Sequence, residues 1–177
     1  MARRPDGHKI LFPDEIILRT DNFIVAQDWE VPIKGFYIIA SRQQRTSITE
    51  FNDREVIELG RLQKLIRECM KTLFGILEVY FFQNEDSSHG FHVWLFPRHA
   101  WMDKIAGRKI ESVRPIMEHA IKHASDEVFR EIRAANNHMR NYLDNLSIQD
   151  YLDQDLLGGD GPVLNIHARD MGRSDRI

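Results

Sequence analysis

A histidine stands in the middle of an apolar, aromatic segment, Phe91–Arg98, which reads FHVWLFPR. Burying an imidazole is costly unless it is hydrogen-bonded, so a histidine satisfied within the core is the simpler interpretation of His92. Three neighbouring features favour a functional role for His92 instead. Trp94 shares a strand face with His92, a polar loop of small residues precedes it, and the guanidinium of Arg98 suits a phosphate. A neutral imidazole is a good nucleophile near pH 7, so the segment predicts phosphate-directed nucleophilic chemistry.

The elements around this segment predict an α+β fold. A helix is expected over 53–73, capped by Asn52 or Asp53 and ended by Gly75, because its apolar residues recur at helical spacing. Runs rich in β-branched and aromatic residues predict about five strands, at 16–19, 23–27, 36–40, 77–83 and 91–97. Three strands, a helix and two strands in this order favour an antiparallel sheet with the helix packed on one face.

The C-terminal part of the chain is predicted to be a helical extension. Apolar residues recur at helical spacing over 111–146, which fits either one long helix or two helices with a break near Ser125. The chain is therefore divided into a domain over 1–102 and an extension with a tail over 103–177.

The order of the elements and the His92 segment together resemble the histidine-triad superfamily of nucleotide hydrolases and transferases. That family has three histidines at alternate strand positions, which fall here on Gly90, His92 and Trp94, followed by Leu95-Phe96-Pro97-Arg98. The resemblance covers 16–102. With Trp101-Met102 just beyond the strand, the segment is similar to a bacterial subgroup described as diadenosine-tetraphosphate-hydrolase-like.

The resemblance implies a role for several residues. In the family the central histidine attacks the α-phosphorus of a nucleotide, while a backbone carbonyl holds its other ring nitrogen; here that histidine is His92. Trp94 is expected either to stack on a base or to pack the C-terminal helix onto the sheet, and Ser87 either to bind phosphate or to form a turn. The substrate-binding residues implied in this way are Gln27, Gln83, Asn84, Ser87, Trp94 and Arg98.

Three positions depart from the family pattern: Gly90 and Trp94 replace triad histidines, and Phe36 stands where many members have another. Indole cannot carry a proton to a leaving group; His99 could do so, although an exposed histidine is commoner. Two functions therefore stay open. One is a hydrolase or nucleotidyl transferase that acts on a nucleotide conjugate, such as a dinucleoside polyphosphate, through a His92-nucleotidyl intermediate. The other is a non-catalytic nucleotide- or partner-binding protein on a degenerate scaffold.

Composition excludes other classes. Among 177 residues the single cysteine, Cys69, rules out an internal disulfide and a cysteine-based zinc site. With 24 Lys and Arg against 27 Asp and Glu, no basic field indicates a nucleic-acid partner. No apolar run approaches the roughly 20 residues of a membrane span, so a reduced, soluble, cytoplasmic protein is expected. The resemblance further implies a homodimer that needs no metal or cofactor. His119 and His123 have metal-ligand spacing without a third ligand, which favours a solvated helix face.

Overall fold

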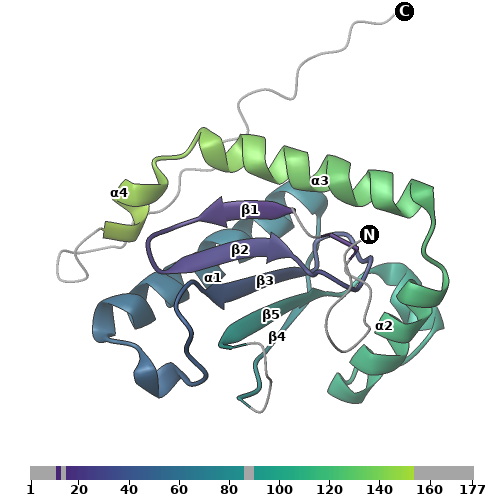
Figure 1. Ribbon diagram of the computed structural model, residues 1–177. Coiled ribbons are helices and arrows are strands. Elements are labelled where there is room, and N and C mark those ends of the chain that lie inside the picture. Colours follow the sequence, from purple (N-terminus) through teal and green to yellow (C-terminus); the bar gives the residue numbers. More distant parts are fainter. Residues whose placement is uncertain (1–10, 13–14, 86–89, 154–177) are drawn as a thin grey trace, which may run out of the picture. The chain divides into compact units, whose positions relative to one another are not determined.

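The computed structural model describes residues 11–12, 15–85 and 90–153, and its centre is a five-stranded antiparallel sheet (Figure 1). The strands lie in the order β1-β2-β3-β5-β4. Their bounds are β1 Ile16–Arg19, β2 Phe23–Gln27, β3 Tyr37–Ser41, β4 Val79–Phe82 and β5 His92–Pro97. Helices pack against this sheet, so the predicted α+β class is confirmed, and each strand lies where the sequence predicts one.

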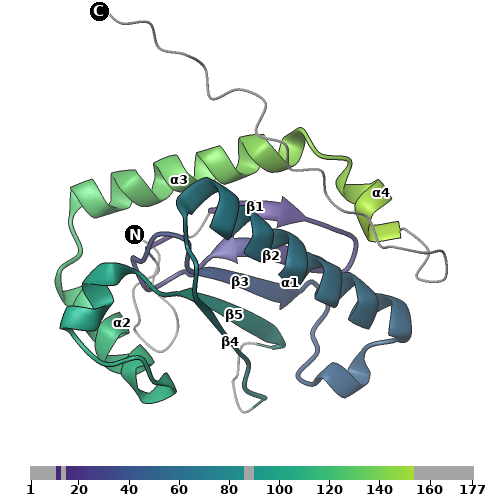
Figure 2. The same cartoon turned by 180° about the vertical axis from the view of Figure 1, so that it is seen from behind.

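Helix α1, Asp53–Phe74, lies across one face of the sheet (Figure 2). It begins at Asn52, whose side chain accepts a hydrogen bond from the Glu55 amide at 3.1 Å while the Glu55 carboxylate accepts one from the Asn52 amide at 2.8 Å. This reciprocal pair satisfies two amides that a helix start would otherwise leave without partners. The helix ends at Gly75, whose φ of 64° closes the last turn in the left-handed conformation.

The predicted helical region over 111–146 consists of two helices, α2 Val113–Lys122 and α3 Asp126–Asp144. The break falls at the position left open by the sequence, because Ser125 accepts a hydrogen bond from the Val128 amide and so starts a new helix. In α2, Ile116 is fully buried in an apolar cluster that also contains Phe36 and Phe96. Helix α2 is therefore part of the packed core.

Helix α3 is tied to the sheet by polar contacts. The Asn136 amide group donates to Glu15 at 3.1 Å and its oxygen accepts from the Tyr37 hydroxyl at 3.3 Å. Arg140 donates to the Ile16 carbonyl at 2.9 Å. These contacts hold α3 beside β1, the edge strand nearest to it (Figure 1).

The chain divides into two compact units, Met1–Leu146 and Ser147–Ile177. Both α2 and α3 belong to the first unit, and the division of the chain into a domain and an extension after Met102 stays a prediction. The short helix α4, Ile148–Asp153, belongs to the second unit. Among the helices of the described residues, none has the length and apolar character needed to cross a bilayer.

The register of the sheet separates its side chains into two faces. His92 lies opposite Ala40 and Trp94 opposite Ile38, whereas Leu95 lies opposite Tyr37. Because successive side chains alternate between faces, His92 and Trp94 lie on one face and Tyr37 on the other. Tyr37 is close enough to Cys69 of α1 for the two groups to interact electrostatically. The His92 face is therefore the one that α1 does not cover.

Candidate functional site

A cavity of about 90 Å³ lies beside the His92 ring. Strand β5 contributes His92 and Trp94, the segment after β2 contributes the other side, and α2 contributes Met117. Its polar and apolar lining includes Asp28, Glu30, Val31, His92, Trp94 and Met117. Ile38 of β3 completes the lining, so the site is built from four segments of the chain, and one of them belongs to the C-terminal helices.

The His92 ring is held by the backbone two residues earlier. Its Nδ1 lies 2.9 Å from the Gly90 carbonyl oxygen, and the residue is only 6% exposed. A carbonyl can only accept a hydrogen bond, so Nδ1 carries the proton, and a neutral ring keeps its lone pair on Nε2. This is the arrangement that the family resemblance implies for an attacking histidine. The ring also packs edge-on against Trp94, with 4.5 Å between ring centroids.

Gly90 has a conformational reason to be glycine. Its φ is 74°, in the left-handed region that residues with a Cβ rarely adopt. A Cβ at this position would also lie 3.2 Å from the Arg45 carbonyl oxygen. That same oxygen accepts a hydrogen bond from the Phe91 amide at 2.5 Å. The left-handed turn at Gly90 thus directs its carbonyl to His92 while Phe91 is fixed to the neighbouring segment.

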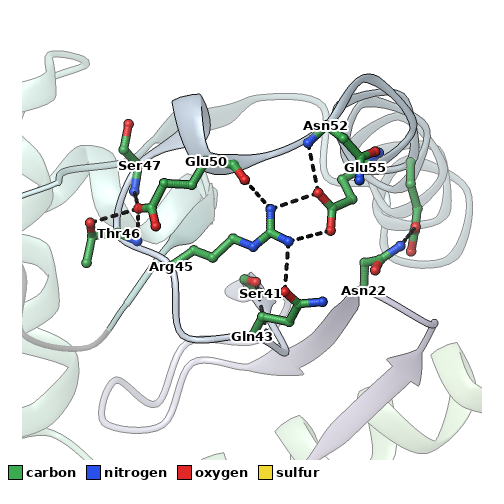
Figure 3. A network of polar contacts seen from close by, with 10 residues as sticks. Asn22, Ser41, Gln43, Arg45, Thr46, Ser47, Glu50, Asn52 and Glu55 are labelled. Carbon is green, nitrogen blue, oxygen red and sulfur yellow. Dashed lines mark hydrogen bonds and ion pairs between the residues drawn. The ribbon is translucent and has the colours of Figure 1, made fainter.

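A polar network holds Arg45 in place (Figure 3). Its two terminal nitrogens each lie 2.8 Å from a Glu55 oxygen, and one of them also donates to Gln43. The Glu55 carboxylate is buried and is shared with the Asn52 amide. A bidentate pair of this kind is geometrically specific, and removing one partner would leave a buried charge. The network therefore fixes the carbonyl that positions Gly90 and Phe91.

Asp28 is a cavity residue that sequence reasoning missed. Its Oδ1 accepts hydrogen bonds from the Glu30 and Val31 amides at 3.0 and 2.9 Å. Burial is the largest influence and raises the pKa of this carboxyl to about 6, although the two amide hydrogen bonds oppose the rise. The sequence does contain a signal for it, because Asp28 is a carboxylate directly after the strand Phe23–Gln27. The segment that follows shows neither helical nor strand periodicity. The sequence predicts a site residue one position earlier, at Gln27.

Trp94 contacts two of the titratable groups that line the cavity, His92 and Asp28. It packs against His92 on one side and against Phe82, with ring centroids 4.9 Å apart, on the other. A hydrogen bond from its side chain helps to lower the pKa of Asp28, against the larger effect of burial. The indole also packs against the apolar cluster that contains α2 residues, so it connects the sheet to that helix.

The structure does not bring Gln27 into this cavity. Gln27 lies opposite Tyr37 in the sheet and is fully buried. Because Tyr37 is on the face opposite His92, the Gln27 side chain is directed away from the site. Its amide nitrogen donates to the Ile33 carbonyl at 3.0 Å, which ties the segment after β2 to the strand.

Arg98 also lies away from His92. It follows the last residue of β5, whereas His92 is the first, and six residues of strand span roughly 20 Å. Its guanidinium donates to Asp103 at 2.6 Å and lies 5.8 Å from the centre of the Tyr80 ring. With its side chain 3% exposed, Arg98 is enclosed in the fold.

The remaining predicted residues lie around the start of β5 or outside the described residues. Gln83 and Asn84 follow β4. The amide nitrogen of Gln83 is buried and has no hydrogen-bond partner among the described residues, and Asn84 is exposed. Neither belongs to the lining of the His92 cavity. Ser87 lies outside the described residues. Phe36 is fully buried, with its ring edge-on to Phe96 at 5.1 Å, and so is a core residue.

His99 lies beyond the far end of β5. Its Nε2 donates to the Lys34 carbonyl at 2.8 Å, and burial lowers the pKa of its imidazole. It lines a second cavity and not the one beside His92. The structure therefore does not bring His99 to the position from which it could protonate a group leaving from His92.

Comparisons with known proteins identify the fold. No protein-family model matches the sequence, and no curated protein is similar to it. A solved structure of the diadenosine triphosphate hydrolase of Plasmodium falciparum aligns with a TM-score of 0.51 and 12% identity, covering 77% of this chain and 84% of that one. A hypothetical histidine triad nucleotide-binding protein of Sulfolobus tokodaii aligns with a TM-score of 0.53 and 13% identity, covering 73% and 85%. The chain has the fold of these histidine-triad proteins.

Proposed function

We propose that this protein is a nucleotide hydrolase or nucleotidyl transferase of the histidine-triad type, in which His92 carries the nucleotidyl group. The observation that supports this most directly is the hydrogen bond between Nδ1 of His92 and the Gly90 carbonyl, beside a cavity. The substrate class is a nucleotide conjugate such as a dinucleoside polyphosphate. The reaction takes place in the cytoplasm and uses no metal ion.

The first step is attack by His92 on the α-phosphorus of the substrate. Nε2 supplies its electron pair, the bond from phosphorus to the leaving oxygen breaks, and the nucleotidyl group becomes attached to the ring. The ring then carries a positive charge, because Nδ1 keeps its proton. The Gly90 carbonyl stabilises that charge, as it accepts the Nδ1 hydrogen at 2.9 Å.

The leaving oxygen needs a proton, and Asp28 is the group that we assign to supply it. Trp94, at the third triad position, cannot do so. Asp28 lines the same cavity as His92, and burial raises its pKa to about 6. A phosphoryl group entering the cavity brings negative charge, which raises the pKa of a neighbouring carboxyl further. Substrate binding therefore favours the protonated, donating form of Asp28.

The second step is hydrolysis of the His92 adduct. The Asp28 carboxylate formed in the first step accepts a proton from water, whose oxygen attacks phosphorus. The phosphorus–nitrogen bond breaks and returns the electron pair to Nε2, so that His92 and the protonated Asp28 are regenerated. If an alcohol or another phosphate takes the place of water, the same sequence transfers the nucleotidyl group.

The size of the cavity limits what lies inside it. A volume of about 90 Å³ takes a phosphoryl group, whereas whole small-molecule sites occupy roughly 300 Å³ or more. The nucleoside therefore lies outside, and its contacts are proposed for Gln83, Asn84 and Ser87, which precede β5. Gln27 and Arg98 are not assigned to the substrate, because both are buried elsewhere in the fold.

Trapping the intermediate tests this proposal. The protein is incubated with a diadenosine polyphosphate labelled at the α-phosphorus and quenched in base, in which a phosphorus–nitrogen bond to histidine survives. We expect label on the wild type, none on His92→Ala, and turnover reduced at least about a thousandfold in that variant. His138→Ala, an exposed histidine on α3, is the matched control and should keep both. Label that persists in His92→Ala would refute the assignment.

The role of Asp28 has its own test. With Asp28→Asn, hydrolysis of the dinucleotide should slow about 10²- to 10⁴-fold, since a general acid contributes that much. A 4-nitrophenyl ester of the same nucleotide has a leaving group that needs no proton and should lose less than about tenfold. If both substrates slow equally, Asp28 binds the substrate instead of donating a proton.

A non-catalytic binding function is the second candidate, and the charge of the cavity favours it. Among the described residues that line the cavity, Asp28 and Glu30 are acidic and none is Lys or Arg. Carboxylates oppose the approach of a phosphate unless at least one is protonated. Saturable nucleotide binding without label transfer, unchanged in His92→Ala, would support this second function.

A further inference from the structure

A second and larger cavity, of about 300 Å³, lies near the opposite end of β5 from His92. It is bounded by 32–34, by the residues after β5, by α2 and by the beginning of α3. The side chains that matter for its chemistry are Lys34, His99, Trp101, His119, His123 and Glu131. None of these lines the His92 cavity, so this is a separate site. Its volume is at the lower end of the range of small-molecule sites.

Three rings along one wall form a nearly parallel series. The His119 and His123 rings stack with centroids 4.0 Å apart and planes inclined by 26°. The Trp101 ring continues the series, 5.9 Å from His119 and inclined by 32°. The two histidines come into register because they are one helical turn apart at the end of α2. Stacked rings cover part of each other's faces, so the series offers a planar aromatic ligand the parts left uncovered by the offset between neighbouring rings, where it can stack in an offset arrangement.

The polar groups of the cavity favour a ligand that donates hydrogen bonds. Nδ1 of His123 lies 2.8 Å from the His119 carbonyl and therefore carries the proton, so a neutral His123 accepts through Nε2. Glu131 adds a carboxylate, which also accepts. The charge of Glu131 is opposite to that of Lys34, so the cavity has no excess positive charge for a polyphosphate. Ala120 and Ile132 are buried and give it an apolar base.

The same geometry argues against a metal site. Within the described part of the chain, no three His, Cys, Asp or Glu side chains are grouped closely enough to hold a metal ion. His99 has its Nε2 engaged with the Lys34 carbonyl, which leaves it as a fixed part of the wall.

We propose that this cavity binds a planar nitrogen heterocycle of two fused rings that bears an N–H donor. The ligand stacks on the Trp101–His119–His123 series, and its N–H donates to Nε2 of His123 or to the Glu131 carboxylate. The apolar base formed by Ala120 and Ile132 accommodates the ring edge that carries no polar atom. This site does not depend on the function proposed for His92.

A matched pair of probes tests the proposal. Benzimidazole carries an N–H donor, and 1-methylbenzimidazole has the same ring system without it. We expect saturable calorimetric binding of benzimidazole, with shifts of the His119 and His123 Cε1–H NMR signals, and at least tenfold weaker binding of the methylated probe. Equal binding of the two probes, or no saturation by benzimidazole at millimolar concentration, would overturn the proposal.

Variants localise the site. Trp101→Ala and His119→Ala each remove one ring of the series and should weaken benzimidazole binding about three- to tenfold. His138→Ala, on the exposed surface of α3, and His92→Ala should bind benzimidazole as the wild type does. Unchanged affinity in both ring variants would refute the site. Zinc binding that moves the same histidine signals at micromolar concentration would show that the cavity holds a metal and would also overturn the proposal.

Discussion

Asp28 keeps its proton at pH values at which exposed carboxyl groups have lost theirs, because burial raises its pKa to about 6. The folded protein therefore binds a proton more tightly than the unfolded chain, in which the ordinary value of 3.8 applies. Between these two values the folded state holds more protons, so the stability contributed by Asp28 falls as pH rises. By pH 7 the loss corresponds to about 3 kcal/mol. A residue that costs this much stability is more simply explained by function than by packing.

We predict that Asp28→Asn stabilises the protein at pH 7.5 while it impairs hydrolysis. Asparagine avoids the buried charge but loses the hydrogen bond from Trp94, which is worth about 1 kcal/mol, so a net gain of about 1–2 kcal/mol is expected. Denaturant unfolding at pH 7.5 and pH 4 measures it. The gain should shrink or reverse at pH 4, where the wild-type carboxyl is protonated. A variant that is less stable at both values would contradict this account.

The sequence allowed the proposed nucleophile, His92, to be inferred but not the neighbouring Asp28. His92 could be selected because it stands in an apolar, aromatic strand. The resemblance implies that a backbone carbonyl accepts from its ring, and the structure shows that this carbonyl belongs to Gly90. Gln27 and Asp28 are adjacent, yet only Asp28 lines the cavity while Gln27 is on the other side of the sheet. The end of β2 determines which of the two residues lines the cavity. The ends of elements are the positions that local sequence patterns define least well.

At the scale of elements, the start of β5 depends on a neighbouring segment whose residues Arg45 and Glu55 do not line the cavity. The Arg45–Glu55 pair fixes a carbonyl, that carbonyl holds Phe91, and the turn at Gly90 directs a second carbonyl to His92. This chain of contacts consists of backbone groups positioned by one buried ion pair. The side-chain pattern of the sequence does not predict these contacts, although it does predict the strand and the helix that they connect.

We predict that Glu55→Gln lowers kcat with little change in KM. The substitution removes the charge that orients Arg45 and leaves a buried guanidinium without its counter-ion, so the Arg45 carbonyl and then Gly90 become less well fixed. A tenfold or smaller loss of kcat is expected, with a change in the ¹⁵N chemical shifts of the His92 ring. Glu68→Gln, on the same helix, is the control. Identical ¹⁵N shifts in Glu55→Gln and the wild type would contradict the positioning role.

Helix α2 belongs to the sheet domain, and substitution at its buried face tests this. Ile116 is fully buried, so Ile116→Ala should destabilise the protein by about 2–5 kcal/mol. Ile121 is 49% exposed on the same helix, and Ile121→Ala should change stability by about 0.5 kcal/mol or less. Chemical denaturation measures both. Equal effects would mean that α2 is an independent extension, as the division after Met102 predicts.

At the scale of the whole molecule, the alternation of apolar residues was sufficient to predict five strands and the α+β class. It was not sufficient to predict how the C-terminal helices pack. The periodicity over 111–146 shows that an apolar face exists, but only the structure shows that Ile116 meets Phe36 and Phe96. The same long-range packing encloses Arg98, which sequence reasoning assigned to phosphate.

The homodimer implied by the family resemblance stays a prediction, and the edge of the sheet is where we expect it to form. β4 is an edge strand, Phe81 on it is 44% exposed, and Leu77 just before it is 71% exposed. Exposed apolar edges of this kind favour pairing with another chain. In analytical ultracentrifugation we expect the wild type to have twice its chain mass of 20.8 kDa and Phe81→Glu to have the mass of a monomer. Ile121→Glu is the control, and a monomeric wild type would contradict the prediction.

The left-handed backbone at Gly90 also constrains how this chain can evolve. A histidine introduced there would have to adopt a rarely tolerated conformation and would crowd the Arg45 carbonyl. Three histidines at positions 90, 92 and 94 would therefore require a different backbone conformation at Gly90 as well as replacement of Trp94. Variants selected for a faster form of the proposed reaction are therefore expected to change the cavity residues after β2 and on α2.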